Sequence, residues 1–193
     1  MPFTAKYVIK HYLEIGRKTN DVYGGVADGE KVVFTKMPEL HSINKIYLDM
    51  TENPCTSVFV KDATIIPAGT TIYSMPVKDK NDEYNSLAEK YDIHFIFDDH
   101  IPTIDFYSVP YVDIMATDSL GGFLGTLGEV SDLDSKAQIC YIDHNKKFFI
   151  IASDFKDLLN NLSNWKEKAI PCEEIILYNS KEEAMGNHKF INI

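Results

Sequence analysis

Apolar and polar positions alternate in blocks through the second half of the chain. Two mostly apolar runs, residues 138–142 and 147–152, are joined by the polar residues 143–146. Aspartate and asparagine favour tight turns because they accept left-handed backbone geometry, so this pattern predicts an antiparallel hairpin. Residues 148–151 are apolar without alternation, which predicts a strand buried on both faces.

A helix is predicted directly after this hairpin. Ser153 or Asp154 can cap it, because a side-chain oxygen at that place accepts a hydrogen bond from the first helical turn. The apolar side chains that follow recur on one helical face and form a stripe suited to a core. They are Phe155, Leu158, Leu159, Leu162 and Trp165. Beyond this helix we expect a strand at residues 174–178 and a polar tail.

Further elements are predicted in the middle of the chain. The charged stretch 78–83 is the best candidate for an internal boundary, and it leads into a short helix over residues 82–90. Pro102 and Pro110 bracket the apolar run 104–109, which favours an edge strand because proline cannot donate to a central ladder. The other strands expected here are residues 93–97 and 111–116.

The N-terminal part shows a helical pattern followed by short β-type runs. Thr4 can cap a first helix that Gly16 ends, and Asp28-Gly29 and Ala68-Gly69 have the composition of turns. The strands expected here are residues 32–34, 45–48, 57–60 and 71–73. This order of helix, many strands and helix predicts an α+β fold, with a mostly antiparallel sheet flanked by a few helices.

Composition narrows the classes of partner. The 193 residues include 19 Lys and Arg against 29 Asp and Glu, a formal net charge of -10. Such a field repels a phosphate backbone, so we expect no nucleic-acid partner, and it favours encounter with a basic protein. The same charge can also simply keep a protein in solution.

The cellular compartment is predicted from three further features. The three cysteines are far apart in sequence, the longest apolar runs are too short to cross a bilayer, and the N-terminus lacks the pattern of a signal peptide. We therefore expect a cytoplasmic protein with no membrane partner.

Residues 117–121, Thr-Asp-Ser-Leu-Gly, are the most reactive-looking motif. A serine between a strand and a glycine is how hydrolases present a nucleophile, and the motif is similar to the Gly-Asp-Ser-Leu block of certain esterases. However, Thr117 replaces the first glycine, and no Asp-x-x-His sequence follows late in the chain. A structural turn is favoured, and the alternative is a small serine hydrolase that uses Ser119 with a histidine such as His144.

Two other groups of residues suggest chemistry only weakly. Asp98, Asp99, His100 and Asp105 include possible metal ligands, but no established ligand spacing supports them, so a solvated turn is favoured. The glycines of residues 121–128 match no phosphate-binding loop, and close backbone approach or irregular strand geometry explains them better. We therefore predict no metal site and no cofactor.

Tyrosine, phenylalanine and aspartate are interleaved between residues 105 and 143. Tyrosine gives rigid contact area and aspartate pairs with Lys or Arg, so this composition suits a protein interface. The alternative is that the apolar positions face the core while the acids face water. The predicted contact residues are Asp105, Tyr107, Asp113, Asp118, Phe123 and Asp143.

Two segments of the second half together carry a family resemblance. Residues 101–122, with the Asp-Ser-Leu-Gly-Gly break after a strand, and residues 139–159, with Tyr-Ile-Asp-His and then Ile-Ala-Ser-Asp-Phe-Lys-Asp-Leu-Leu, resemble the SUKH superfamily. That superfamily includes proteins similar to fungal cell-wall assembly regulators and many bacterial immunity proteins. The resemblance implies one SUKH-like α+β domain over residues 1–193, in which residues 1–80 are divergent and residues 90–193 are recognisable.

The same resemblance implies a function. It predicts a non-catalytic module that neutralises a bacterial toxin by direct binding, with no catalytic residues, and the negative charge suits a basic toxin domain. The alternatives are the serine hydrolase described above and a regulatory interaction module without a toxin. The sequence does not indicate an oligomeric state.

Overall fold

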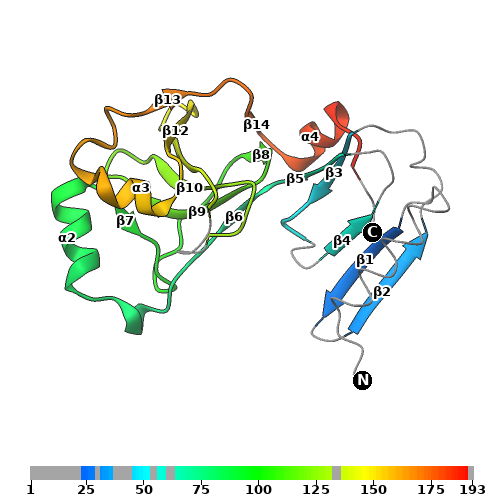
Figure 1. Cartoon of the computed structure of the whole chain (residues 1–193), viewed down its shortest axis with the longest axis horizontal. Coiled ribbons are helices and arrows are strands. Elements are labelled where there is room, and N and C mark those ends of the chain that lie inside the picture. Colours follow the sequence, from blue (N-terminus) through cyan, green and yellow to red (C-terminus); the bar gives the residue numbers. More distant parts are fainter. Residues whose placement is uncertain are drawn as a thin grey trace. The chain divides into compact units, whose positions relative to one another are not determined.

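The computed structural model describes residues 23–28, 31–36, 45–52, 56–59, 64–131 and 136–190, and it has the expected α+β fold (Figure 1). The chain divides into two compact units, one of Met1–Pro67 with Glu182–Ile193 and the other of Ala68–Lys181. The charged stretch 78–83 lies within the second unit, so the unit boundary falls before it. Among the described residues, no helix is long and apolar enough to cross a membrane.

The described part of the first unit is mainly strands. β1 (Tyr23–Asp28) pairs antiparallel with both β2 (Lys31–Lys36) and β4 (Thr56–Phe59), and β3 (Lys45–Asp49) pairs with β5 (Thr64–Ala68). These strands confirm the predicted runs at residues 32–34, 45–48 and 57–59. The predicted helix of residues 4–16, the turn residue Gly29 and strand residue Val60 lie outside the described residues.

The C-terminal part of this unit contains a helix that the sequence patterns did not indicate. Within the predicted polar tail, residues Lys181–Asn187 form helix α4, in which Ala184 is fully buried. After this helix, the Tyr47 backbone N–H donates to Lys189 O at 2.9 Å, and the Tyr47 ring contacts those of His188 and Phe190. A single small residue on the buried face gives too weak an apolar pattern to reveal such a helix from sequence.

The second unit is built on one mixed sheet. Its central strands are β9 (Val112–Thr117), β10 (Phe123–Leu127), β11 (Ile139–Ile142) and β12 (Phe148–Ala152), each antiparallel to the next. β13 (Ile170–Pro171) pairs with β12, while β6 (Thr70–Ile72), parallel, and β7 (His94–Phe95) both pair with β9. The structure therefore confirms the predicted hairpin and the strand after Tyr111.

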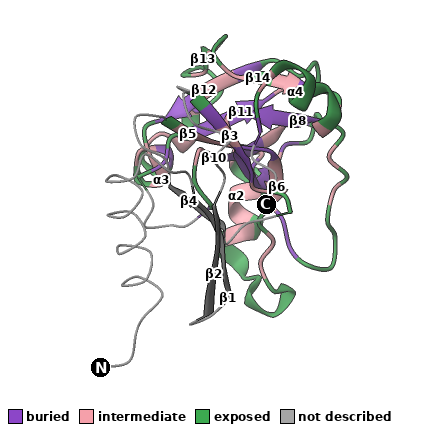
Figure 2. Cartoon of the chain, turned by 90° about the vertical axis from the view of Figure 1, so that its right-hand side faces the viewer, coloured by how far each residue is buried: buried purple, intermediate pink, exposed green. Residues whose placement is uncertain are grey.

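Both faces of this sheet are covered. On one face, Met115, Leu124 and Ile151 pack against Leu158 of α3 (Phe155–Asn160) and against Trp165. On the other, Ile114 and Cys140 pack with Phe106 and with side chains near β14 (Ile176–Tyr178). Accordingly, β11 is buried throughout (Figure 2), and in β12 Phe148 and Ile151 are buried while the two residues between them are half-buried.

Three predicted elements differ in detail. The expected strand at 104–109 is shorter, because only β8 (Tyr107–Val109) forms, and it pairs with β14 rather than with the main sheet. Helix α3 ends at Asn160 and a 3-10 turn (Leu162–Asn164) follows, so the apolar stripe is interrupted and Leu159 is 45% exposed. The glycine-rich segment contains β10, which runs through the centre of the sheet.

Candidate functional site

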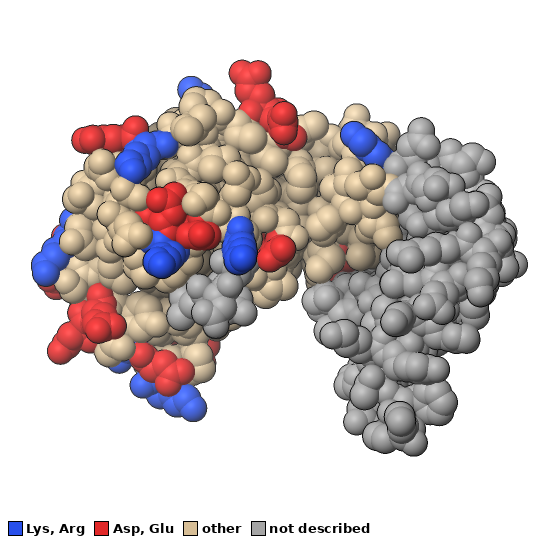
Figure 3. Space-filling view, in the orientation of Figure 1, with Lys and Arg blue, Asp and Glu red and all other residues tan. Residues whose placement is uncertain are grey.

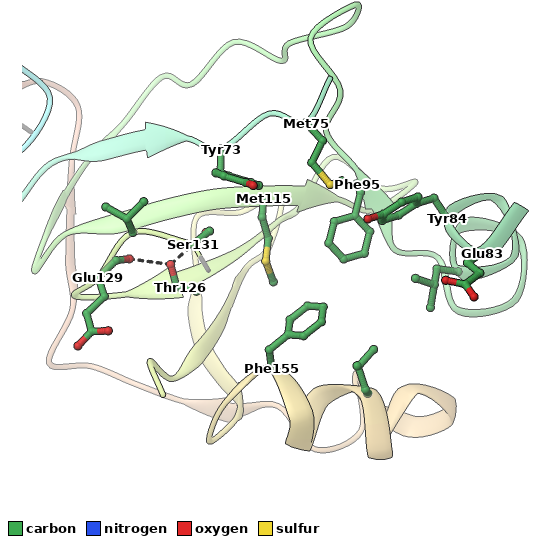
Figure 4. Close-up of a pocket in the computed structure, with 13 residues that line it drawn as sticks. Tyr73, Met75, Glu83, Tyr84, Phe95, Met115, Thr126, Glu129, Ser131 and Phe155 are labelled. Carbon is green, nitrogen blue, oxygen red and sulfur yellow. Dashed lines mark hydrogen bonds between the residues drawn. The ribbon is translucent and has the colours of Figure 1, made fainter. Parts of the chain in front are cut away.

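An apolar pocket of about 950 Å³ opens in the second unit between the sheet and two helices, α2 (Asp82–Tyr91) and α3 (Figure 4). Nearly half of its described lining residues are aromatic or methionine, among them Met75, Tyr84, Phe95, Met115 and Phe155. At its rim three apolar side chains remain accessible: Tyr73 is 43% exposed, Val130 51% and Leu159 45%. A large apolar surface of this kind is unusual on a protein unless it binds something.

Ring contacts fix the aromatic wall. The Tyr84 ring lies edge-on to Phe95 and to Phe97, with centroids 5.4 Å apart in each pair, and Phe95 lies edge-on to Phe155 at 6.3 Å. Edge-to-face packing is a favoured geometry because the positive ring edge meets the negative ring face. The wall is therefore preorganised.

Capping residues position the two helices that carry this wall. Asn81 Oδ1 accepts hydrogen bonds from the backbone of Glu83 and Tyr84 at the start of α2. Asp154 Oδ1 accepts one from Asp157 N at 2.8 Å, which confirms the predicted cap of α3. Since Phe155 and Leu159 are four residues apart, they lie on one side of this helix, and both line the pocket.

A buried carboxylate fixes the polar residue Ser131 at one end of the pocket. Asp113, only 2% exposed, accepts hydrogen bonds from Thr71 Oγ1 at 2.6 Å and from Ser131 N at 2.7 Å. Tyr111 Oη lies 2.6 Å from Thr71 Oγ1, and burial, with a smaller contribution from the Asp113 charge, raises the pKa of Tyr111 to about 12. This network joins β6 and β9 to the segment after β10.

A second polar network, the Asp92 network, lies at the end of α2. Lys166 Nζ donates to Asp92 Oδ2 at 2.8 Å and to Asp118 Oδ2 at 3.0 Å. Asp118 also accepts hydrogen bonds from Tyr141 Oη at 2.8 Å and from Gly122 N at 2.7 Å. The Asp118 side chain has no exposed surface, so these donors replace the water it has lost.

The ionisation of this network follows from its contacts. Burial acts to raise the pKa of Asp118, but hydrogen bonds from Gly122, Tyr141 and Lys166 outweigh it, and the pKa lies below its ordinary value. At Asp92 burial is likewise outweighed by hydrogen bonds, from Lys166 and Ser119 above all, which lower its pKa strongly. Burial would lower the pKa of Lys166, yet the two carboxylates raise it. The network is therefore a stable set of opposite charges.

Ser119 belongs to this network. Its backbone N–H and its Oγ donate to the two carboxylate oxygens of Asp92, at 2.8 and 3.0 Å. His94 Nε2 lies 3.1 Å from Asp92 Oδ1, whereas Ser119 Oγ contacts the other oxygen, Asp92 Oδ2. The ring of the other candidate, His144, contacts Asn145 Nδ2. A carboxylate with a lowered pKa is a weak base, so these contacts explain Ser119 as part of a turn.

The six predicted contact residues fall in different places. Tyr107, Asp113 and Asp118 are buried, so a partner can reach their side chains only after a rearrangement. The exposed Asp105 pairs with Lys146 at 3.0 Å, and Asp143 Oδ1 accepts hydrogen bonds from the turn of the β11–β12 hairpin. Phe123 of β10 is half-buried and pairs in register with Ile142, which belongs to β11 of that hairpin. Asp105, Phe123 and Asp143 are thus the predicted contacts that a partner can reach.

The remaining candidate chemistry also has a place in the structure. Asp98 Oδ1 accepts a hydrogen bond from Val77 N at 2.9 Å, and within the described ranges no three His, Cys, Asp or Glu side chains are grouped so as to hold a metal ion. Close contacts explain two of the glycines: a Cβ on Gly125 would lie 2.3 Å from the backbone oxygen of Asp113, and one on Gly122 would lie 2.6 Å from the Tyr141 side chain.

The sequence patterns did not indicate the pocket, and within the Asp92 network they did not indicate Asp92 or Lys166. The pocket lining comes from segments between Tyr73 and Leu159, and the apolar stripe of α3 indicated one part of it. Asp92 occupies the left-handed position that ends α2, at φ 57°, which aspartate tolerates better than most residues.

Comparisons with protein-family models, with curated proteins and with solved structures find no match to this chain.

Proposed function

We propose that this chain is a non-catalytic module that binds another protein. The observation that carries the proposal is the preorganised apolar pocket with its exposed rim at Tyr73, Val130 and Leu159. Aromatic and methionine side chains are enriched at protein interfaces, and fixed rings lose little entropy on binding. Ser119, the residue that most suggested catalysis, and its neighbour Asp118 already have hydrogen-bonded partners within the Asp92 network.

The finer proposal is an immunity protein that acts in the cytoplasm on a basic toxin domain. It is supported by the sequence resemblance described above and by the net charge of -10. Opposite charge accelerates encounter and disfavours wrong partners, which an inhibitor of a lethal protein requires.

Co-expression tests this proposal. The product of the gene next to that of this chain is expressed alone and together with the chain, while growth and complex formation are measured. We expect the neighbouring product to arrest growth alone and to be neutralised in a complex that weakens as salt rises. Growth arrest without rescue, or the lack of any toxic neighbour, would count against the immunity role.

The hydrolase alternative has its own test. A fluorophosphonate probe, which reacts with activated serines, should leave the folded chain unlabelled because Ser119 Oγ donates to Asp92. Labelling that disappears in the Ser119→Ala variant, and persists in Ser163→Ala, would instead establish Ser119 as a nucleophile.

A further inference from the structure

We infer that the pocket receives an amphipathic segment of a basic protein, with one or two large apolar side chains inside and Lys or Arg beside them. This inference rests on the proposed binding function and specifies which surface carries it and what the partner presents. Its starting point is the juxtaposition of an apolar interior with acidic residues at the edge.

The dimensions of the pocket suit more than one side chain. A volume of about 950 Å³ lies at the upper end of the roughly 300–1,000 Å³ typical of ligand sites. The accessible rim residues extend apolar contact beyond the interior, as a peptide with several anchors requires. Apolar anchors on one face of a short segment, spaced to enter a groove, are a recurring mode of peptide recognition.

Charge identifies the class of partner. Residues 68–181 contain 19 acidic and 10 basic residues, a net charge of -9, so nearly all of the chain's excess lies in the unit that holds the pocket. On the face shown in Figure 3, acidic and basic side chains of this unit are interspersed, and this face shows no single acidic patch. At the pocket itself, however, the charged lining residues among those the structure describes are Glu83 and Glu129, and no described Lys or Arg lines it.

The two glutamates lie at opposite ends of the pocket (Figure 4). A segment bound between them would bring flanking cations close to both carboxylates, whereas an acidic segment would be repelled. The net charge also disfavours a second copy of this chain as the occupant, because two molecules of charge -10 repel each other.

Designed peptides test the inference on the full chain. The probe is a short fluorescent peptide with a Trp and a Leu on one face and lysines on either side. Two matched peptides replace either the lysines by glutamate or the Trp and Leu by serine. Fluorescence anisotropy should show binding of the first peptide alone, and binding should weaken with salt. Equal binding of the lysine and glutamate peptides, or no binding of the lysine peptide, would overturn the inference.

Matched variants locate the binding. Leu159→Ser removes an accessible apolar side chain at the pocket, whereas Leu120→Ser makes the same change at a residue that is 65% exposed and does not line it. We expect the first to weaken binding about tenfold, since burying a leucine is worth about one such factor, and the second to leave it unchanged. An equal loss in both variants would place binding elsewhere.

Charge variants and the oligomeric state complete the test. Neutralising Glu83 and Glu129 together to glutamine should weaken binding, while Glu89→Gln, on the same helix but outside the lining, should not. A wild-type dimer that Leu159→Ser converts to a monomer would show that a second copy occupies the pocket and would overturn the inference. If the toxin partner binds the Leu159→Ser variant normally, the proposed function stands and only this placement fails.

Discussion

Lys166 connects two carboxylates that are distant from it in sequence, Asp92 by 74 residues and Asp118 by 48. Lys166→Met should destabilise the protein, because the buried Asp118 carboxylate would lose its counter-charge. The expected loss is about 1–2 kcal/mol, at the lower end for a buried charge, since Lys166 is 40% exposed and Asp118 keeps other donors. Urea unfolding measures it, and Lys156→Met, at an exposed lysine of α3, is the control; equal effects would contradict this role.

The same network predicts how stability depends on pH. Folding lowers the pKa values of Asp92 and Asp118 below their ordinary 3.8, so between the folded and the unfolded pKa the unfolded chain binds more protons. The stability that these two carboxylates contribute is therefore present above the ordinary pKa and is lost as the pH falls through the folded-state pKa values. We expect the urea midpoint to decline as pH falls below about 4, and Asp118→Asn to show a shallower decline. Parallel declines in the two proteins would assign the acid sensitivity to other carboxyls.

At the scale of an element, β10 depends on a residue that lacks a side chain. Gly125 lies against the backbone of β9, where a Cβ would be 2.3 Å from Asp113 O, and the register shifts next to it. Gly125→Ala should cost about 1–3 kcal/mol, because backbone must move to make room. Gly186→Ala in α4, where nothing lies within 4 Å, should be neutral or stabilising. Thermal unfolding compares the two, and a stable Gly125→Ala variant would show that the sheet adjusts easily.

Elements with strong local signals were predictable, and β10 shows why others were not. The β11–β12 hairpin and the Asp154 cap each depend on neighbouring residues, so the sequence pattern indicated them. Gly125 of β10 and Gly122 just before it are instead required by contacts with Asp113 and Tyr141, which are distant in sequence, and glycine itself lowers strand propensity. The α+β class followed from element order, whereas the pocket depends on several distant segments meeting, which no local pattern records.

The dependence on residues distant in sequence also explains why some of the predicted contact residues are buried. Interleaved aromatic and acidic residues fit an interface and a buried polar network equally well, because both use tyrosine and aspartate hydrogen bonds. Only the fold separates them: Asp113 and Asp118 are enclosed, while Asp105 stays exposed beside Lys146.

At the scale of the whole molecule, the charge and the pocket should affect different steps of binding. The excess of acidic residues acts over distances set by ionic strength and therefore governs the rate of encounter. The pocket acts only after contact, when apolar side chains leave water, and therefore governs how long a complex lasts. For the lysine-flanked peptide, raising salt should lower the association rate constant and change the dissociation rate constant little.

Leu159→Ser should have the opposite effect to salt, because it should change the dissociation step and not the association step. Leu159→Ser should raise the dissociation rate constant about tenfold and leave association nearly unchanged, because it removes buried apolar area without altering charge. Stopped-flow anisotropy measures both constants, with Leu120→Ser as the control for a general effect of the substitution. If salt and Leu159→Ser instead changed the same rate constant, recognition would not divide into long-range attraction by the acidic unit and short-range retention by the pocket.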